Sequence, residues 1–139
     1  MIYVDTGAFI ARYLKRDQYF ARAQIRWKGL HDSTIPLYTS NFVINETVTF
    51  LARIAGYDFA YERVREIYSS TELIMLRATA KDEQHALELF RKYAGQKISF
   101  TDCVSFVLIS KPPGGTLLLA FNTNRPSVAQ RISVTLAAV

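Results

Sequence analysis

The chain has few of the residues that would point to a secreted, membrane-bound or zinc-binding protein. Cys103 is the single cysteine among 139 residues, so an internal disulfide is excluded. No apolar run approaches the ~20 residues that a membrane-spanning helix needs. The start does not resemble a signal peptide, and the two histidines are too isolated to suggest a zinc site. From these absences we expect a cytoplasmic protein.

Negative charge is missing from the end of the sequence. All 12 acidic residues lie at or before Asp102, so residues 103–139 carry no acid. Chance in a short segment is one explanation. A shift of the coding frame near residues 112–115, which read Pro-Pro-Gly-Gly, is the other.

Positive charge is instead concentrated near the start. The net charge is +5, half of the residues are hydrophobic and 21% are charged, which is typical of one globular domain over residues 1–139. The excess of positive charge mildly favours a polyanionic partner. A single acid, Asp17, interrupts the basic stretch, which is either a solvated helix face or a surface that contacts phosphates or a partner. Its basic residues are Arg12, Lys15, Arg16, Arg22, Arg26 and Lys28.

Strands alternate with helices along the chain. Hydrophobic patterning predicts short strands over residues 1–4, 37–39, 73–76 and 117–121. Helices are expected over 6–14, 18–28, 42–55, 57–68, 80–93 and 102–110. We expect Gly29 to end the second helix, and Ala86, Leu89 and Phe90 to form the apolar stripe of the fifth. This alternation predicts an α/β fold with a parallel sheet covered on both faces.

Two aspartates stand where such a fold places ligands. Asp5 follows the first strand directly, at the carboxyl edge where open parallel sheets bind ligands. Asp102 starts an otherwise apolar helix. Each has a simpler interpretation, because aspartate is a good N-cap and is favourable in a first helical turn. Position alone does not separate these alternatives.

Glu46 is harder to explain by local structure. Val43 at i−3 and Phe50 at i+4 place its carboxylate on a largely apolar helix face. Burial of an unpaired carboxylate is costly, which favours a partner or a metal. A glutamate at the margin of the core that reaches water is the equal alternative.

The residues around these three acids resemble a known family. Residues 2–7 (Ile-Tyr-Val-Asp-Thr-Gly), 39–47 and 99–106 are similar to the three acidic motifs of PIN-domain nucleases, and their order resembles that of VapC-type toxins. The resemblance extends from Met1 to about Ile109. It implies a three-layer α/β/α sandwich with a short, mostly parallel central sheet. It also implies an Mg²⁺ or Mn²⁺ site, endoribonuclease activity, a cognate antitoxin and a homodimer.

The resemblance also suggests roles for individual residues. Asp5 and Asp102 are candidate metal ligands, and Glu46 is a ligand or orients the attacking water, because hard divalent cations select carboxylate oxygens. Thr6 and Ser105 are candidate hydroxyl donors behind these ligands. Each is otherwise a cap or a surface hydroxyl.

One family position lacks its acid. After the last predicted strand, Asn124 aligns with the expected aspartate, and Asn122 is the second choice. An amide oxygen coordinates a hard cation but supplies no negative charge. The alternative function is therefore a weakened PIN domain that binds RNA or a protein without cutting. A different Mg²⁺-dependent phosphotransfer enzyme is disfavoured, since Asp5 has no second nearby Asp and the chain has no P-loop.

Overall fold

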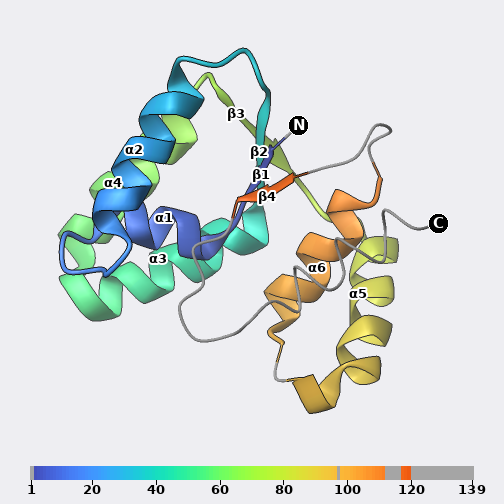
Figure 1. Ribbon diagram of the computed structural model, residues 1–139. Helices are drawn as coiled ribbons and strands as arrows, with labels where there is room; N and C mark the ends of the chain where they lie inside the picture. The colour runs from blue at the N-terminus through green and yellow to red at the C-terminus, as the bar shows by residue number, and fades with distance from the viewer. Residues whose placement is uncertain (1, 97, 112–116, 120–139) are drawn as a thin grey trace.

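Four parallel strands form the centre of the molecule. The structure is a computed structural model that describes residues 2–96, 98–111 and 117–119 (Figure 1). The sheet has the order β3-β2-β1-β4, and every strand pairing within the described residues is parallel. Its strands are β1 (Ile2–Val4), β2 (Leu37–Ser40), β3 (Leu73–Leu76) and β4 (Leu117–Leu119).

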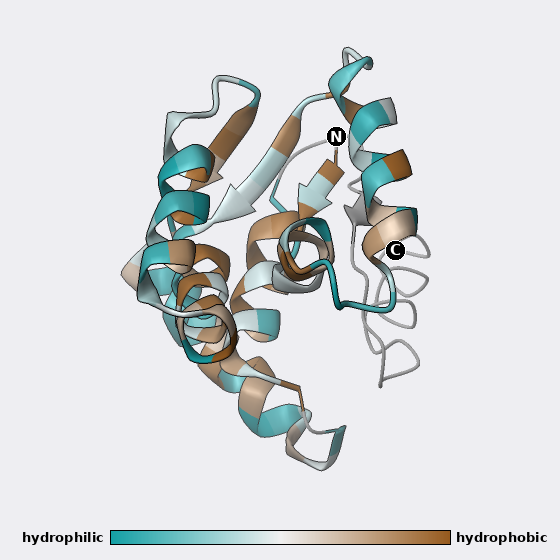
Figure 2. Ribbon diagram, turned by 90° about the vertical axis from the view of Figure 1, so that its left-hand side faces the viewer, coloured by the Kyte–Doolittle hydropathy of each residue, from teal (hydrophilic) through white to brown (hydrophobic). Residues whose placement is uncertain are grey.

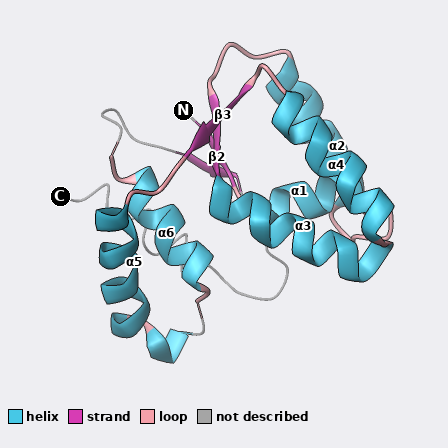
Figure 3. Cartoon of the chain, turned by 180° about the vertical axis from the view of Figure 1, so that it is seen from behind, coloured by secondary structure: helices cyan, strands magenta, loops and turns pink. Residues whose placement is uncertain are grey.

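Helices cover both faces of this sheet. The helices are α1 (Thr6–Tyr13), α2 (Phe20–His31), α3 (Asn41–Ala55), α4 (Tyr57–Ser69), α5 (Ala80–Lys92) and α6 (Phe100–Ile109), with a short 3₁₀ helix, η1 (Ala94–Gln96). Figure 3 shows α1 to α4 on one side of the strands and α5 and α6 on the other. The predicted three-layer α/β/α sandwich is confirmed, and its sheet is parallel throughout the described residues.

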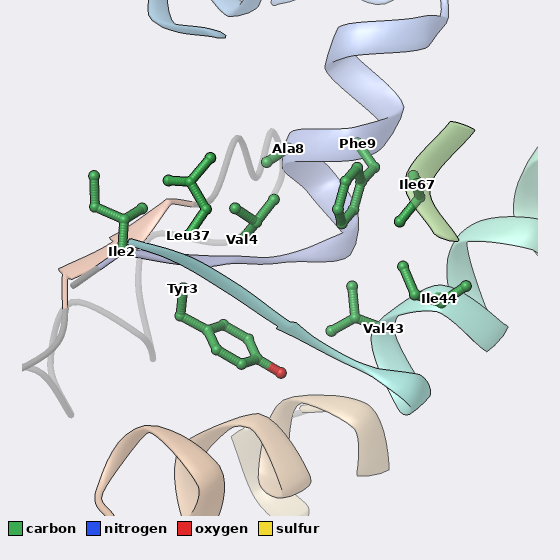
Figure 4. Close-up of a cluster of buried hydrophobic side chains, with 9 residues drawn as sticks. All are labelled: Ile2, Tyr3, Val4, Ala8, Phe9, Leu37, Val43, Ile44 and Ile67. Atoms are coloured by element: carbon green, nitrogen blue, oxygen red, sulfur yellow. The ribbon is translucent and has the colours of Figure 1, made fainter. Parts of the chain in front are cut away.

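The strand β1 directs side chains alternately to the two helical layers. Ile2 and Val4 lie on one side, as Figure 4 shows, and Tyr3 points to the other side. The Tyr3 hydroxyl pairs with Ser105 of α6 at 3.1 Å. The buried β1 therefore holds both layers together, and this fixes the chain on which Asp5 stands.

Two buried clusters correspond to the two layers. The first joins β1 and β2 to α1, α3 and α4, with Phe9, Val43 and Ile44 fully buried. The second joins α5 to α6 through Ala86, Val104 and their neighbours. In Figure 2 the helices show both hydrophobic and hydrophilic residues, as expected for elements that each cover one face of a core.

Two predicted helix boundaries were wrong. Gly29 lies inside α2, which continues to His31, because glycine within a helix costs only about 1 kcal/mol and Leu30 packs against the first cluster. The last helix starts at Phe100 rather than at Asp102, because Ser99 is its N-cap. The other predicted helices agree with the structure to within about two residues. Residues 120–121 of the predicted last strand lie outside the described part.

One apolar side chain that was predicted to face a core is exposed, and two tyrosines of α4 are exposed as well. Phe90, placed by periodicity in the stripe of α5, is 42% exposed, whereas Ala86 in the same stripe is fully buried. Tyr61 and Tyr68 of α4 are also exposed. Among the described residues, no helix combines the length and apolar character needed to cross a membrane.

Candidate active site

The site forms where β1 and β2 end side by side. The two strands are parallel neighbours, so their carboxyl ends lie at the same edge of the sheet. Asp5 follows β1, and Ser40 closes β2 and accepts a hydrogen bond from the Val43 backbone N–H at 3.2 Å as the N-cap of α3. The starts of α1 and α3 are thereby held at the position that the sequence predicted for a ligand.

Asp5 is at this edge without serving as a side-chain cap. It occupies the N-cap position of α1, yet its carboxylate makes no capping hydrogen bond there. Burial and the neighbouring carboxylates of Asp102 and Glu46 together raise its pKa to about 7, against a lowering effect of the Thr6 backbone N–H. Asp102 and Glu46 therefore lie within electrostatic reach of Asp5.

Glu46 is held by a hydroxyl from another helix. The Thr6 side chain of α1 donates a hydrogen bond to Oε2 of Glu46, in the second turn of α3, at 2.5 Å. Both side chains are half-buried. The structure thus brings Thr6 next to one of the predicted acids, and this contact links the starts of α1 and α3.

Asp102 is oriented by the first turn of its own helix. It stands at the third position of α6, where its Oδ2 accepts from the Ser99 backbone N–H at 2.7 Å. In return the Ser99 hydroxyl accepts from the Asp102 backbone N–H at 3.1 Å. This reciprocal arrangement is a capping box. The simpler interpretation of Asp102 therefore holds, and it is compatible with a role in the site because the same carboxylate acts on Asp5.

The charges of these acids have no cationic partner among the described residues. No ion pair within residues 2–96, 98–111 and 117–119 involves Asp5, Glu46 or Asp102. In the same part of the chain, no three His, Cys, Asp or Glu side chains are gathered as a ready metal-binding group. The donor chemistry nevertheless fits a hard divalent cation, since all three are carboxylates.

The adjacent Cys103 thiol stays protonated, because burial and Asp102 raise its pKa to about 11.

Ser105 is placed differently from Thr6. Its hydroxyl pairs with Tyr3, and no hydrogen bond among the described residues joins it to the three acids. Burial raises the pKa of Tyr3 to about 12, and the charge of Asp5 contributes to this rise. Tyr3 was not singled out in the sequence. A tyrosine inside an otherwise aliphatic strand was the available signal, because a buried phenol needs a partner.

Some side chains of the basic stretch contact other parts of the protein, and the others extend into solvent. Arg12 is half-buried, with its guanidinium carbon 4.2 Å from the centroid of the Trp27 ring. Arg16 donates to the Ile54 carbonyl at 2.8 Å. The remaining members are exposed to solvent: Lys15, Arg22, Arg26 and Lys28. Arg22 and Arg26 lie one turn apart on α2. The asparagines predicted to replace the family's last acid, Asn122 and Asn124, lie outside the described residues.

Comparisons with known proteins agree with this architecture. The sequence matches the family model of the PIN domain over residues 2–123. The fold is similar to the crystal structure of VapC20 from Mycobacterium tuberculosis, a toxin that cleaves the sarcin–ricin loop. The TM-score is 0.78 at 28% identity, over 89% of this chain and 92% of that chain. A comparison with curated proteins gives no match.

Proposed function

Because this chain belongs to the PIN domain family, we propose that it is a metal-dependent endoribonuclease and the toxin of a type II toxin–antitoxin pair. The observation that supports the proposal is the place of Asp5 at the carboxyl edge of the sheet, within electrostatic reach of Asp102 and Glu46, with no ion pair to any of these acids among the described residues. The similarity to the toxin VapC20 supports the same conclusion.

Each acid has a distinct environment and therefore a distinct role. Asp5 and Asp102 are the proposed ligands of Mg²⁺ or Mn²⁺, which supplies Lewis-acid stabilisation of charge on the phosphate when bound. Glu46, fixed by the Thr6 hydroxyl, is a further ligand or accepts a proton from the attacking water. Ser99 holds Asp102, and Ser105 supports Tyr3 beneath the site.

Cleavage of a pool of structured RNA tests this proposal. The purified protein is incubated with Mn²⁺, with Mg²⁺ or with EDTA, beside Asp5→Asn and Asp102→Asn. The control is Asp58→Asn, which makes the same chemical change at an exposed acid on α4. Cutting that needs a metal and is lost only in the two site variants supports the nuclease. Equal cutting by Asp5→Asn would contradict it.

We assign RNA or antitoxin contact to the basic stretch, with the exposed Arg22 and Arg26 as its core. Phosphate contacts weaken as salt rises, so the double variant Arg22→Glu/Arg26→Glu should bind RNA less tightly and with a smaller salt dependence. Arg77→Glu/Lys81→Glu makes the same charge change at two other exposed positions. If both double variants lost RNA affinity equally, the loss would reflect the change in net charge and not a contact made by Arg22 and Arg26.

A homodimer is the assembly that we propose. The turn at Gly56 between α3 and α4 is flanked by exposed apolar and aromatic side chains, namely Phe50, Ile54, Tyr57 and Tyr61. Such a patch is typical of a protein contact. In sedimentation experiments Ile54→Glu should give a monomer. Ile25→Glu, at an exposed isoleucine of α2, should leave the dimer intact.

The second candidate is a weakened PIN domain that binds RNA or a protein in the cytoplasm without cutting. The asparagine at position 124, where the family expects an acid, favours it. A folded protein that cuts with neither metal, and an Asn124→Asp variant that does, would select this candidate over an active toxin.

A further inference from the structure

A buried phenol lies between the sheet and α6, beneath the edge that carries the acids. Tyr3 of β1 and Ser105 of α6 are both buried, and their hydroxyl oxygens are 3.1 Å apart. Figure 4 shows the Tyr3 ring on the side of the strand opposite to Ile2 and Val4. The two hydroxyls meet inside an otherwise apolar layer, because the other buried side chains of α6 are Cys103, Val104, Val107 and Leu108.

Each member of this pair is close in the chain to one of the acids. The backbone is still extended at Asp5, with φ −94° and ψ 167°, so alternation places its side chain on the same side of the chain as Tyr3. Ser105 follows Asp102 by three residues, so these two share a face of α6. The bond between the hydroxyls therefore joins the strand that ends before Asp5 to the helix that carries Asp102.

The third acid is connected to Tyr3 through β2. The strands β1 and β2 are parallel neighbours, and their register places Ser40 level with Asp5. Ser40 is the N-cap of α3, the helix that carries Glu46. Burial is the largest influence on the pKa of Tyr3, which a hydrogen bond to Ser40 lowers and the charge of Asp5 raises. The phenol is thus in contact with the elements that hold all three acids.

Stability alone gives little reason to keep this pair of hydroxyls. A buried hydroxyl loses its hydrogen bonds to water, and a bond to another buried hydroxyl does little more than replace them. The double variant Tyr3→Phe/Ser105→Ala would remove both oxygens and leave the apolar layer filled. A hydrogen bond, however, allows only a narrow range of lengths and angles, so it restricts how α6 can shift against β1.

We propose that the Tyr3 hydroxyl is a positioning group that sets the separation of the three acids. Its bond to Ser105 fixes α6 against β1, and its bond to Ser40 fixes the start of α3. This inference rests on the proposed metal-dependent function and names the residue that determines how tightly the site holds a divalent cation. Carboxylates repel one another, so acids that are loosely held move apart and bind a cation less tightly.

Binding of Mn²⁺ to the full chain without RNA tests the proposal separately from cleavage. The paramagnetic resonance signal of free Mn²⁺ gives the dissociation constant. Tyr3→Phe and Ser105→Ala should each weaken Mn²⁺ binding by roughly 10- to 100-fold. The double variant should lose no more than either single variant, because both remove the same bond. Tyr38→Phe is the matched control, since it removes the same atom from the half-buried tyrosine that pairs with Tyr3 in β2. It should bind Mn²⁺ as the parent does.

Urea denaturation separates positioning from packing. The double variant should keep a urea midpoint close to that of the parent, because it replaces both partners of the bond. Val107→Ala, at a buried position of α6, should lower the midpoint and keep the Mn²⁺ affinity. Equal Mn²⁺ affinity in the parent and the double variant would overturn the proposal. So would a loss of affinity in Val107→Ala as large as that in Tyr3→Phe, since it would trace the affinity to the stability of α6.

The same measurements distinguish this proposal from the nuclease itself. A parent that binds no Mn²⁺ would refute the metal site and the positioning role with it. A parent that binds Mn²⁺ through Tyr3 but cuts no RNA would refute the nuclease and uphold the positioning role.

Discussion

Asp82 and Asp102 occupy the same position in two matching helix starts, but within the described part of the chain only Asp82 is paired with a cation. Asp82 accepts from the Thr79 backbone N–H at 2.8 Å and Asp102 from the Ser99 backbone N–H at 2.7 Å, each in a capping box. The Lys111 ammonium group lies 2.5 Å from Asp82 and lowers its pKa to about 2, together with Thr79. One box is thus neutralised within the protein, whereas the other presents its charge to Asp5.

This contrast predicts different outcomes for the two caps. Ser99→Ala and Thr79→Ala should each lower the free energy of unfolding by about 1 kcal/mol through the lost capping hydrogen bond, and Thr79→Ala also removes the bond that its hydroxyl donates to Asp82. Only Ser99→Ala should also lower RNA cleavage, because it loosens the helix start that carries Asp102, although the backbone N–H of residue 99 still donates to the Asp102 carboxylate. Urea denaturation and initial cleavage rates measure the two effects. Equal loss of activity in both variants would trace it to stability alone.

Acid denaturation should report on Asp82. Its pKa is about 2 in the folded protein and 3.8 in a model peptide, so the folded state binds the proton less tightly. The resulting stabilisation is fully present above pH 3.8 and is lost as the pH falls toward 2. Asp82→Asn should therefore flatten the fall in unfolding free energy between pH 4 and 2, measured by urea titration. Lys111→Met should reduce the same slope. An unchanged slope in both variants would contradict the ion pair.

Replacing Asp5 should separate function from stability. Asp5→Asn should abolish cleavage, yet it should raise the urea midpoint at pH 8 in EDTA. The reason is that burial, together with the neighbouring Asp102 and Glu46 carboxylates, raises the pKa of Asp5 in the folded protein, so its negative charge is destabilising at pH 8. Asp58→Asn, at an exposed acid, is the control for midpoint shifts. A lower midpoint in Asp5→Asn would mean that this carboxylate stabilises α1 more than it repels its neighbours.

The hydroxyl of Thr6 should act through Glu46. Thr6→Val keeps the shape of the side chain but removes the donor to Oε2 of Glu46. We expect a lower kcat with little change in KM, and a shifted pH profile of kcat, because Glu46 loses its orienting hydrogen bond. Thr6→Ser restores the donor and should recover most of the rate. A kcat of Thr6→Val equal to that of the parent would show that Thr6 does not act through Glu46.

The sequence predicted the backbone positions of the site residues better than it predicted their side-chain contacts. The place of Asp5 after β1 followed from the sequence because the end of a buried strand is a local feature. The contact of Thr6 with Glu46 joins residues from two helices, and only the packed fold determines such a distance. The family resemblance suggested a role for Thr6 without naming its partner.

Elsewhere periodicity alone was misleading. Phe90 has the spacing of a core residue, but among the described residues α5 packs mainly against α6, and this contact leaves Phe90 42% exposed. Gly29 has the composition of a helix end, but the packing of Leu30 extends α2 past it. In both cases tertiary contacts outweighed a local preference.

The position of β1 between β2 and β4 has a consequence for synthesis on the ribosome. The strand β1 needs, on one side, a neighbour that is made after β2 and β3, since Ile2 pairs with Leu117 of β4. A growing chain that has reached Ile109 contains Asp5, Glu46 and Asp102, but β1 still has one open edge. Ribosomes add roughly 5–20 residues per second, so every chain passes briefly through this incomplete state during its synthesis. We therefore expect the ribosome to carry an incomplete nuclease, which gains its rigid acidic edge only after β4 has emerged.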